Sequence, residues 1–123
     1  MSARNAKAIE LELRFVCFGS DIVRISSKLT VTAEGKHISG QILRSGTAAA
    51  ANYGEARGAE SRKDFIHKLR IVLKELNETA IWLQLIAKSS LLPAEMISGV
   101  LAENRELCRI IAASIKTARG GTP

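Results

Sequence analysis

Apolar side chains recur at steps of three and four residues along most of this chain, with polar side chains between them. That spacing is typical of amphipathic helices. The pattern weakens in a polar segment at residues 30–37, after a glycine at position 58, and ahead of a proline at position 93. We therefore predict four helices, over residues 9–29, 38–57, 61–91 and 94–118, followed by a frayed tail.

The first predicted helix carries its apolar residues with occasional irregularities in their spacing. Gly19 and Ser20 interrupt it weakly, but an isolated glycine costs a helix only about 1 kcal/mol. One continuous helix is therefore expected. Its predicted apolar side consists of Leu13, Val16, Cys17, Ile22, Val23, Ile25 and Leu29.

The second predicted helix is rich in small residues, from Gly46 through a run of alanines at positions 48–51. So little side-chain bulk allows a neighbouring helix to approach closely. Arg44 and Glu55 lie at the two ends of one alanine face. We expect a neighbouring helix there, held by Arg44 and Glu55 through hydrogen bonds or ion pairs, because buried charges need partners; a ligand site is the alternative. Asn52 is expected to hydrogen bond across the same contact.

The third predicted helix separates an apolar side from a basic side. Gly58 is placed to end the preceding helix, and Ser61 with Asp64 resembles a capping box at the start of this one. Steps of three and four define a core-facing seam, which consists of Phe65, Leu69, Val72, Leu76, Ala80, Leu83 and Ala87. The opposite side carries Lys63, Arg70, Lys74 and Lys88.

The fourth predicted helix begins after Pro93, which cannot continue the helix before it. Asn104 interrupts its apolar stripe; it either fixes the register from inside the core or, as we favour, lies at the edge of the stripe. Short connections between four such helices predict antiparallel neighbours. The expected fold is all-α, a single domain with an up-down-up-down four-helix bundle.

Composition supports this fold and narrows the chemistry. Of the 123 residues, 46% are hydrophobic and only 4% aromatic, so the core must consist mainly of aliphatic side chains. Cys17 and Cys108 lie in apolar surroundings without metal ligands at the required spacing, so both are interpreted as buried thiols. Neither a signal core nor a membrane span is evident, which favours the cytoplasm and no membrane partner.

Catalytic and cofactor-binding patterns are missing from the chain. His37 falls in a predicted loop and His67 on a polar side, and neither has a partner at helical spacing. Glu75 and Glu78 are one turn apart but lack the Glu-x-x-His motif of metal-binding bundles. We therefore expect a protein that is not an enzyme, with no catalytic residues, cofactor or metal.

The charge balance suggests an anionic partner. Eighteen Lys and Arg against twelve Asp and Glu leave a net charge of +6. The best candidates for phosphate contact lie on or beside the third helix, at Arg57, Arg62, Lys63, Arg70 and Lys74. Tyr53 and Trp82 are expected to be mostly buried, so no exposed aromatic ring is left for stacking on bases. We therefore predict binding to the sugar–phosphate backbone of a nucleic acid. An ordinary solvated surface is the alternative.

Several short motifs resemble those of one family. Its pattern runs Gln-Leu-x-Arg-Ser-Gly-Thr-Ser-Ile, Ala-Asn-x-x-Glu-Ala, Ser-x-x-Asp-Phe-Ile-x-Lys and Leu-Lys-Glu-x-x-Glu-Thr-x-x-Trp-Leu. The chain matches at residues 41 and 44–47, 51–52 and 55–56, 61, 64–66 and 68, and 73–75, 78–79 and 82–83. It departs at Ala48 and Ala49, where Ser-Ile is usual. The chain thus resembles the four helix bundle protein family of 23S rRNA intervening sequences.

The resemblance implies an antiparallel four-helix bundle and ring-shaped homo-oligomers, pentamers among them. It also implies structural roles for the matching motif residues, of which the most informative are Arg44, Asn52, Glu55, Phe65, Glu78 and Trp82. A more distant similarity, to the pentameric accessory protein of diversity-generating retroelements, favours RNA or DNA as a partner. It assigns no particular residue, since fold does not imply function.

Two hypotheses of different classes follow. The first is a non-enzymatic oligomer whose repeated basic face binds nucleic acid through many weak contacts. The second is a scaffold that assembles with itself and recruits a protein partner, its charge being solvated surface. An uncharacterised enzyme is a third possibility. It is disfavoured because the sequence contains no recognisable set of catalytic residues.

Overall fold

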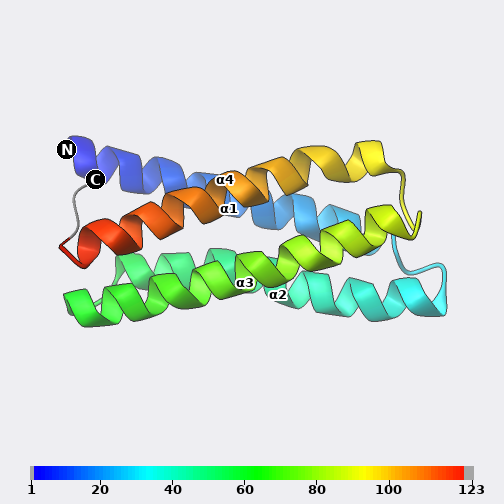
Figure 1. Ribbon diagram of the computed structural model, residues 1–123, viewed down its shortest axis with the longest axis horizontal. Helices are drawn as coiled ribbons and strands as arrows, with labels where there is room; N and C mark the ends of the chain where they lie inside the picture. The colour runs from blue at the N-terminus through cyan, green and yellow to red at the C-terminus, as the bar shows by residue number, and fades with distance from the viewer. Residues whose placement is uncertain (1, 121–123) are drawn as a thin grey trace.

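A computed structural model describes residues 2–120 of the chain, and these fold into four long helices (Figure 1). The helices are α1 (Ala3–Ser27), α2 (Ala33–Arg57), α3 (Arg62–Lys88) and α4 (Ala94–Ala118). Figure 1 shows successive helices running in alternate directions, with short connections at both ends. The predicted antiparallel up-down-up-down four-helix bundle is confirmed.

Two helices begin earlier than the hydrophobic pattern predicts. α1 begins at Ala3 instead of residue 9, and α2 begins at Ala33 instead of residue 38. Side chains of Ser2 and Thr32 accept hydrogen bonds from backbone N–H groups of these first turns, which satisfies donors that a helix start leaves free. The first turns contain few large apolar residues, so periodicity alone did not reveal them.

The end of α3 also differs from the prediction. The helix ends at Lys88, not at residue 91, because Ser90 adopts the left-handed backbone conformation with φ 61°. The N–H of Leu91 then donates to the carbonyl oxygen of Ile86 at 3.1 Å, which closes the helix end. Ser61 caps the start of α3 by accepting a hydrogen bond from the N–H of Asp64, as predicted.

One aliphatic core runs along the bundle axis, and all four helices contribute to it. The seam predicted on α3 is largely confirmed, since Leu69, Val72, Leu76 and Leu83 are completely buried. Phe15 of α1 stacks on Tyr53 of α2 with ring centroids 4.8 Å apart. The largest fully buried side chains are Phe15, Phe18, Ile22, Ile42, Leu69, Leu76, Leu83, Ile86, Ile97, Leu107, Ile111 and Val72.

Helices that follow each other in sequence pack side by side. α2 contacts both α1 and α3, and α3 contacts α4, whereas α1 and α4 share a smaller contact. Among the described helices, the pairs α1 and α3, and α2 and α4, have no Cα atoms within 8 Å of each other, so only their side chains meet, in the core. α1 and α3 therefore occupy diagonally opposite corners, and their outer faces point away from each other.

Small residues let α1 and α2 pack closely, as the sequence predicts. A Cβ atom at Gly46 would lie 2.7 Å from Ile22 Cγ2, which is inside contact distance. At Gly19 the same atom would meet Ala50 Cβ at 3.7 Å, an ordinary contact. Gly46 is thus required for the close approach, whereas Gly19 tolerates a methyl group.

α1 carries two apolar faces, one toward the core and one toward the outside. The sequence pattern predicts a single apolar side. Phe18 and Ile22 face the core, while Val16 and Val23 point outward and are about half exposed. Cys17 is exposed on this outer side, so its interpretation as a buried thiol is wrong. Cys108 is partly buried, and burial raises the pKa of its thiol.

Asn104 lies inside the core, so its favoured placement at the edge of the stripe is also wrong. Its side chain is fully buried. Asn104 Nδ2 donates to the backbone carbonyl oxygen of Leu76 at 2.9 Å, which links α4 to α3. A helical carbonyl has a second lone pair that can accept such a bond. Burial without loss of hydrogen bonding makes this residue a register-setting contact between the two helices.

Candidate nucleic-acid interface

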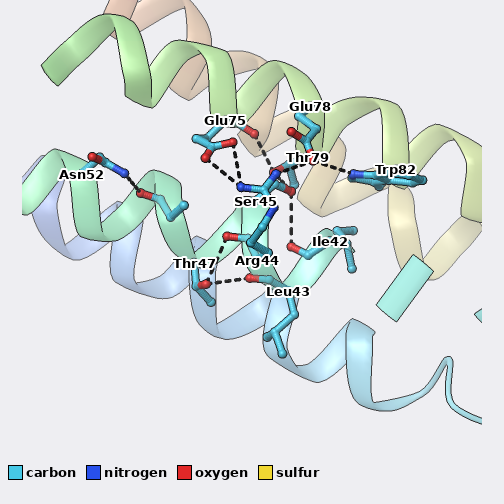
Figure 2. A network of polar contacts seen from close by, with 11 residues as sticks. Ile42, Leu43, Arg44, Ser45, Thr47, Asn52, Glu75, Glu78, Thr79 and Trp82 are labelled. Carbon is cyan, nitrogen blue, oxygen red and sulfur yellow. Dashed lines mark hydrogen bonds and ion pairs between the residues drawn. The ribbon is translucent and has the colours of Figure 1, made fainter. Parts of the chain in front are cut away.

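Arg44 on α2 binds two carboxylates of α3. Its Nη1 atom donates to Glu75 Oε2 at 2.9 Å, and its Nη2 atom donates to Glu78 Oε2. Figure 2 shows the guanidinium pointing between these two carboxylates. The side chain of Arg44 is 50% exposed, so each ion pair by itself contributes little, about 0–1 kcal/mol. Arg44 acts by joining two carboxylates in one network.

Glu78 accepts a second hydrogen bond, from a side chain of its own helix. Trp82 Nε1 donates to Glu78 Oε2 at 3.0 Å. The hydrogen bond from Trp82 and the one from Arg44 lower the pKa of Glu78 below its ordinary value. Trp82 is mostly buried against the core, as predicted, and its polar edge is satisfied by this bond.

Two buried hydroxyl groups lie directly below the ion pairs. Thr79 Oγ1 is 2.8 Å from Ser45 Oγ and 2.8 Å from the backbone carbonyl oxygen of Glu75. Both side chains are completely buried. Polar atoms enclosed in this way stabilise a packing only when they are hydrogen bonded, so the pair favours one register of α2 against α3.

A second ion pair joins the other end of the α2–α3 contact. Lys68 Nζ lies 3.1 Å from Glu55 Oε1. Arg44 and Glu55 therefore both ion-pair with α3, as the helix-packing interpretation predicts. Asn52 behaves differently, since its Nδ2 donates to the carbonyl oxygen of Ala48 within α2 at 2.8 Å and does not cross the contact (Figure 2). Phe65 packs partly buried against the core.

The candidate phosphate-binding residues on α3 have a different environment. Arg62, Lys63, Arg70 and Lys74 are all exposed. Within residues 2–120, none of the four has a carboxylate oxygen at ion-pair distance. None of the four is therefore held in a direct ion pair, although Lys74 still acts on the carboxylate of Glu78 through space. Cations without a direct partner favour binding of an anion.

Arg57 differs from the other four candidates. Its Nη1 atom lies 3.3 Å from Glu12 Oε1 of α1, and its side chain is only 26% exposed. This ion pair uses the guanidinium to join α2 to α1. Arg57 therefore offers less free charge to a partner than its neighbours Arg62 and Lys63.

Positive charge is concentrated in one half of the bundle. Cutting each helix near its middle places twelve Lys and Arg and five Asp and Glu in residues 2–15, 45–74 and 107–120. Residues 16–44 and 75–106 hold six Lys and Arg and seven Asp and Glu. The first half carries +7 and the second −1, so the half where α3 begins and α4 ends is the basic pole of the molecule.

The structure adds two residues to the basic face that the sequence did not single out as binding residues. Arg119, just after α4, and His67 line the same hollow as Arg62, Lys63 and Arg70. Arg119 is 49 positions from Arg70 in sequence, so only the packing of α4 on α3 could bring the two together. Lys74 is not among the residues that line this hollow.

Among residues 2–120, the remaining titratable groups form no catalytic arrangement. His37 lies in the first turns of α2 and not in a loop, and its ring meets Trp82 edge-on with centroids 6.2 Å apart. Residues 2–120 contain no group of three His, Cys, Asp or Glu side chains placed to hold a metal ion. No helix in that part of the chain is long and apolar enough to span a membrane.

The bundle and its motif network define the class of protein: an all-α four-helix bundle without a recognisable catalytic centre in residues 2–120. A family model described as 23S rRNA-intervening sequence protein matches residues 14–113. The chain belongs to this family. Its matched region includes the ion-pair network and the basic face of α3, and excludes Arg119.

One solved structure is closely similar. It is described as a protein with unknown function from the S23 ribosomal protein family of Bacteroides thetaiotaomicron. The two chains are 36% identical, with a TM-score of 0.82, and the match covers 86% of this chain and 98% of the other. No curated protein matches the chain significantly. Neither the family description nor this neighbour names an activity, so the function has to be argued from the site.

Proposed function

We propose that this protein is a non-enzymatic homo-oligomer that binds the phosphate backbone of nucleic acid through the basic face of α3. The observation that carries the proposal is the absence of carboxylate partners around Arg62, Lys63, Arg70 and Lys74 within residues 2–120. By contrast, five other arginines each have a carboxylate partner, namely Arg14, Arg24, Arg44, Arg57 and Arg109. Uncompensated charge on a rigid helix supports backbone contact with little sequence preference.

Assembly would multiply this weak contact. Each copy contributes only a few phosphate contacts, but several copies in one particle bind a long nucleic acid with much higher avidity. Outward-facing apolar residues support assembly. They are Leu13, Val16 and Val23 on α1, Leu43 on α2, Ile81 and Leu85 on α3, and Met96 on α4.

The placement of these residues favours a ring. α1 and α3 occupy opposite corners of the bundle, so their exposed apolar faces point in different directions. Two different faces that pair head to tail generate a closed ring when the rotation closes. A pentamer is the ring size we propose, by similarity to other bundles of this family.

Replacing Val16 and Val23 with Glu tests this assembly. The double variant should release folded subunits of lower mass, because charges would be buried in the interface. A matched control is Val31→Glu, since Val31 is 90% exposed in the α1–α2 connection. Light scattering coupled to size exclusion measures the mass; an unchanged oligomer in the double variant would contradict this interface.

Nucleic-acid binding is tested by reversing three charges. Replacing Lys63, Arg70 and Lys74 with Glu should weaken RNA or DNA binding at low salt by tenfold or more, roughly 1.4 kcal/mol. Fluorescence anisotropy with a labelled oligonucleotide over a range of salt concentrations measures both the affinity and its salt dependence.

The control reverses three other exposed charges. Lys36, Lys88 and Arg105 also make no ion pair within residues 2–120, and their replacement by Glu changes the net charge equally. We expect the control to lose much less affinity. Equal losses in both triple variants would show that total charge matters and that the α3 face does not.

A second candidate function is a scaffold that recruits a protein partner. The outward apolar residues favour it, because exposed apolar faces are typical of protein–protein contacts. Retention of a defined protein by the nuclease-treated oligomer at high salt would support the scaffold, since salt screens charge contacts but not apolar ones. Salt-sensitive retention of nucleic acid alone supports the first proposal.

A further inference from the structure

A hollow lies where the beginning of α3 meets the end of α4. Its volume is about 540 Å³. Residues of α3 form most of its wall, and one arginine comes from the end of α4. The lining consists of Arg62, Lys63, Ile66, His67, Arg70 and Arg119.

The chemistry of this lining is that of an anion site with an apolar part. Four of its six residues are Lys or Arg, and no carboxylate lines it. Ile66 is partly buried and packs against the core, so it offers a fixed apolar surface. The imidazole of His67 is a flat ring on the exposed side of the helix. The hollow thus presents cations, an aliphatic surface and one planar ring together.

The size of the hollow exceeds what one phosphate requires. Its volume falls in the range of about 300–1,000 Å³ found for clefts that hold small organic ligands, but the hollow is open to solvent and would cover only part of a nucleotide. A nucleotide combines a dianionic or bridging phosphate with a sugar and a flat base, and it matches the three kinds of surface in this hollow. Aromatic and cationic planes are the surfaces on which unstacked bases bind in proteins that recognise single strands.

We propose that this hollow seats one unstacked nucleotide of a single-stranded nucleic acid. The phosphate binds among Arg62, Arg70 and Arg119, and the base lies against Ile66 and His67. This inference rests on the proposed nucleic-acid function and narrows it to single strands. A duplex keeps its bases stacked inside, so it can offer the hollow only a phosphate.

An adjoining hollow supports a path for the strand. It has a volume of about 500 Å³ and shares Arg119 with the first. Its other lining residues are Ala112, Ile115, Lys116 and Gly120. Lys116 is exposed and has no carboxylate partner within residues 2–120. A strand that leaves the first hollow therefore meets another free cation beyond Arg119.

The two histidines of the chain provide a direct test. His67 lines the hollow, whereas His37 lies beside Trp82 near the start of α2. NMR spectra of the imidazole groups are followed while uridine monophosphate or inorganic phosphate is added. We expect nucleotide to shift the His67 signals more than phosphate does, with those of His37 unchanged. Equal shifts of His67 by both probes, or no shift, would overturn the placement of the base.

Binding of a labelled 12-mer as a single strand and as a duplex gives the second test. His67→Ala should weaken single-strand binding by about fivefold through lost stacking and leave duplex binding unchanged. Arg119→Gln should lower the slope of log affinity against log salt by about 0.7 for the single strand. Arg105→Gln is the matched control, since it removes the same charge from an exposed position on α4 outside the hollow.

The outcomes separate this inference from the proposed function. If the Lys63, Arg70 and Lys74 variant abolishes binding while the His67 and Arg119 variants bind both probes normally, the α3 face binds nucleic acid and the nucleotide seat is wrong. If none of these variants changes binding, the proposed function fails as well. Selective loss of single-strand binding in His67→Ala supports the seat.

Discussion

Two adjacent stretches of α3 differ in whether cationic side chains beside them have carboxylate partners. Between Glu75 and Trp82 the helix supplies carboxylates that bind Arg44 of α2. Between Arg62 and Lys74 it supplies mainly cations, and four of them have no carboxylate partner within residues 2–120. One helix thus separates charge used to hold the fold from charge that remains available to a partner.

The difference has an energetic meaning. Arg44 organises Glu75, Glu78 and, through Glu78, the indole of Trp82, so its removal disturbs several groups at once. The uncompensated residues near the start of α3 repel one another and contribute no such contacts. Natural proteins keep locally unfavourable arrangements mainly at functional sites. The charge cluster on this face therefore supports the nucleic-acid binding that we propose.

Removing the carboxylates should make the middle of α3 resemble its beginning. In the double variant Glu75→Gln and Glu78→Gln, Arg44 loses both ion pairs, and the free energy of unfolding should fall by about 1–2 kcal/mol. The freed guanidinium should also tighten nucleic-acid binding modestly. Urea denaturation and anisotropy measure the two effects; unchanged stability would show that the network is not what holds α2 to α3.

Adding a carboxylate should make the beginning of α3 resemble its middle. Lys74→Glu removes one cation and places a carboxylate four residues after Arg70, at ion-pair spacing on a helix. Affinity for nucleic acid should fall by several-fold more than in Lys74→Gln, since Arg70 becomes partly neutralised. Equal losses in the two variants would mean that Arg70 takes no part in binding.

The stability that the Arg44 network contributes should depend on pH, because it requires the ionised carboxylate of Glu78. Its pKa is lowered in the folded protein, chiefly by the hydrogen bond from Trp82 and then by Arg44. Glu78 therefore contributes stability that is complete above the ordinary pKa of 4.5 and is lost as the pH falls through the lower folded pKa. Glu78→Gln should be less stable than the parent at pH 7, with the difference shrinking below about pH 4.5.

The matched variant for this acid titration is Glu60→Gln, because Glu60 is exposed in the connection between α2 and α3 and makes no ion pair within residues 2–120. Its stability should follow the parent at every pH. A stability difference for Glu78→Gln that stays constant from pH 7 to pH 3 would contradict the role of the ionised carboxylate.

Local signals allowed most of the fold to be predicted. The regular seam of α3, the cap at Ser61 and the stop at Gly58 each depend on residues within one or two turns. The buried face of α1 was harder to predict. Val16 and Cys17 continue its apolar pattern, but they lie on the outer surface and not in the core. Periodicity reports an apolar side but does not say what covers it.

The parts of the candidate site that depend on contacts between helices were the hardest to predict from sequence. Ion pairing of Arg44 and Glu55 with a neighbouring helix could be inferred, since both flank one face of α2. Burial of Asn104 and the approach of Arg119 to Arg70 depend on the register between α3 and α4. No local motif encodes that register, so the hollow could not be found from sequence.

The most direct test of the account exchanges the two kinds of arginine for glutamine, one at a time. For Arg44→Gln and Arg70→Gln, both the free energy of unfolding and the affinity for a single-stranded oligonucleotide are measured. Arg44→Gln should lose about 1 kcal/mol of stability and keep its affinity, whereas Arg70→Gln should keep its stability and lose affinity and salt dependence. If Arg70→Gln binds as tightly as the parent, or Arg44→Gln loses affinity without losing stability, the division between structural and binding charge is contradicted.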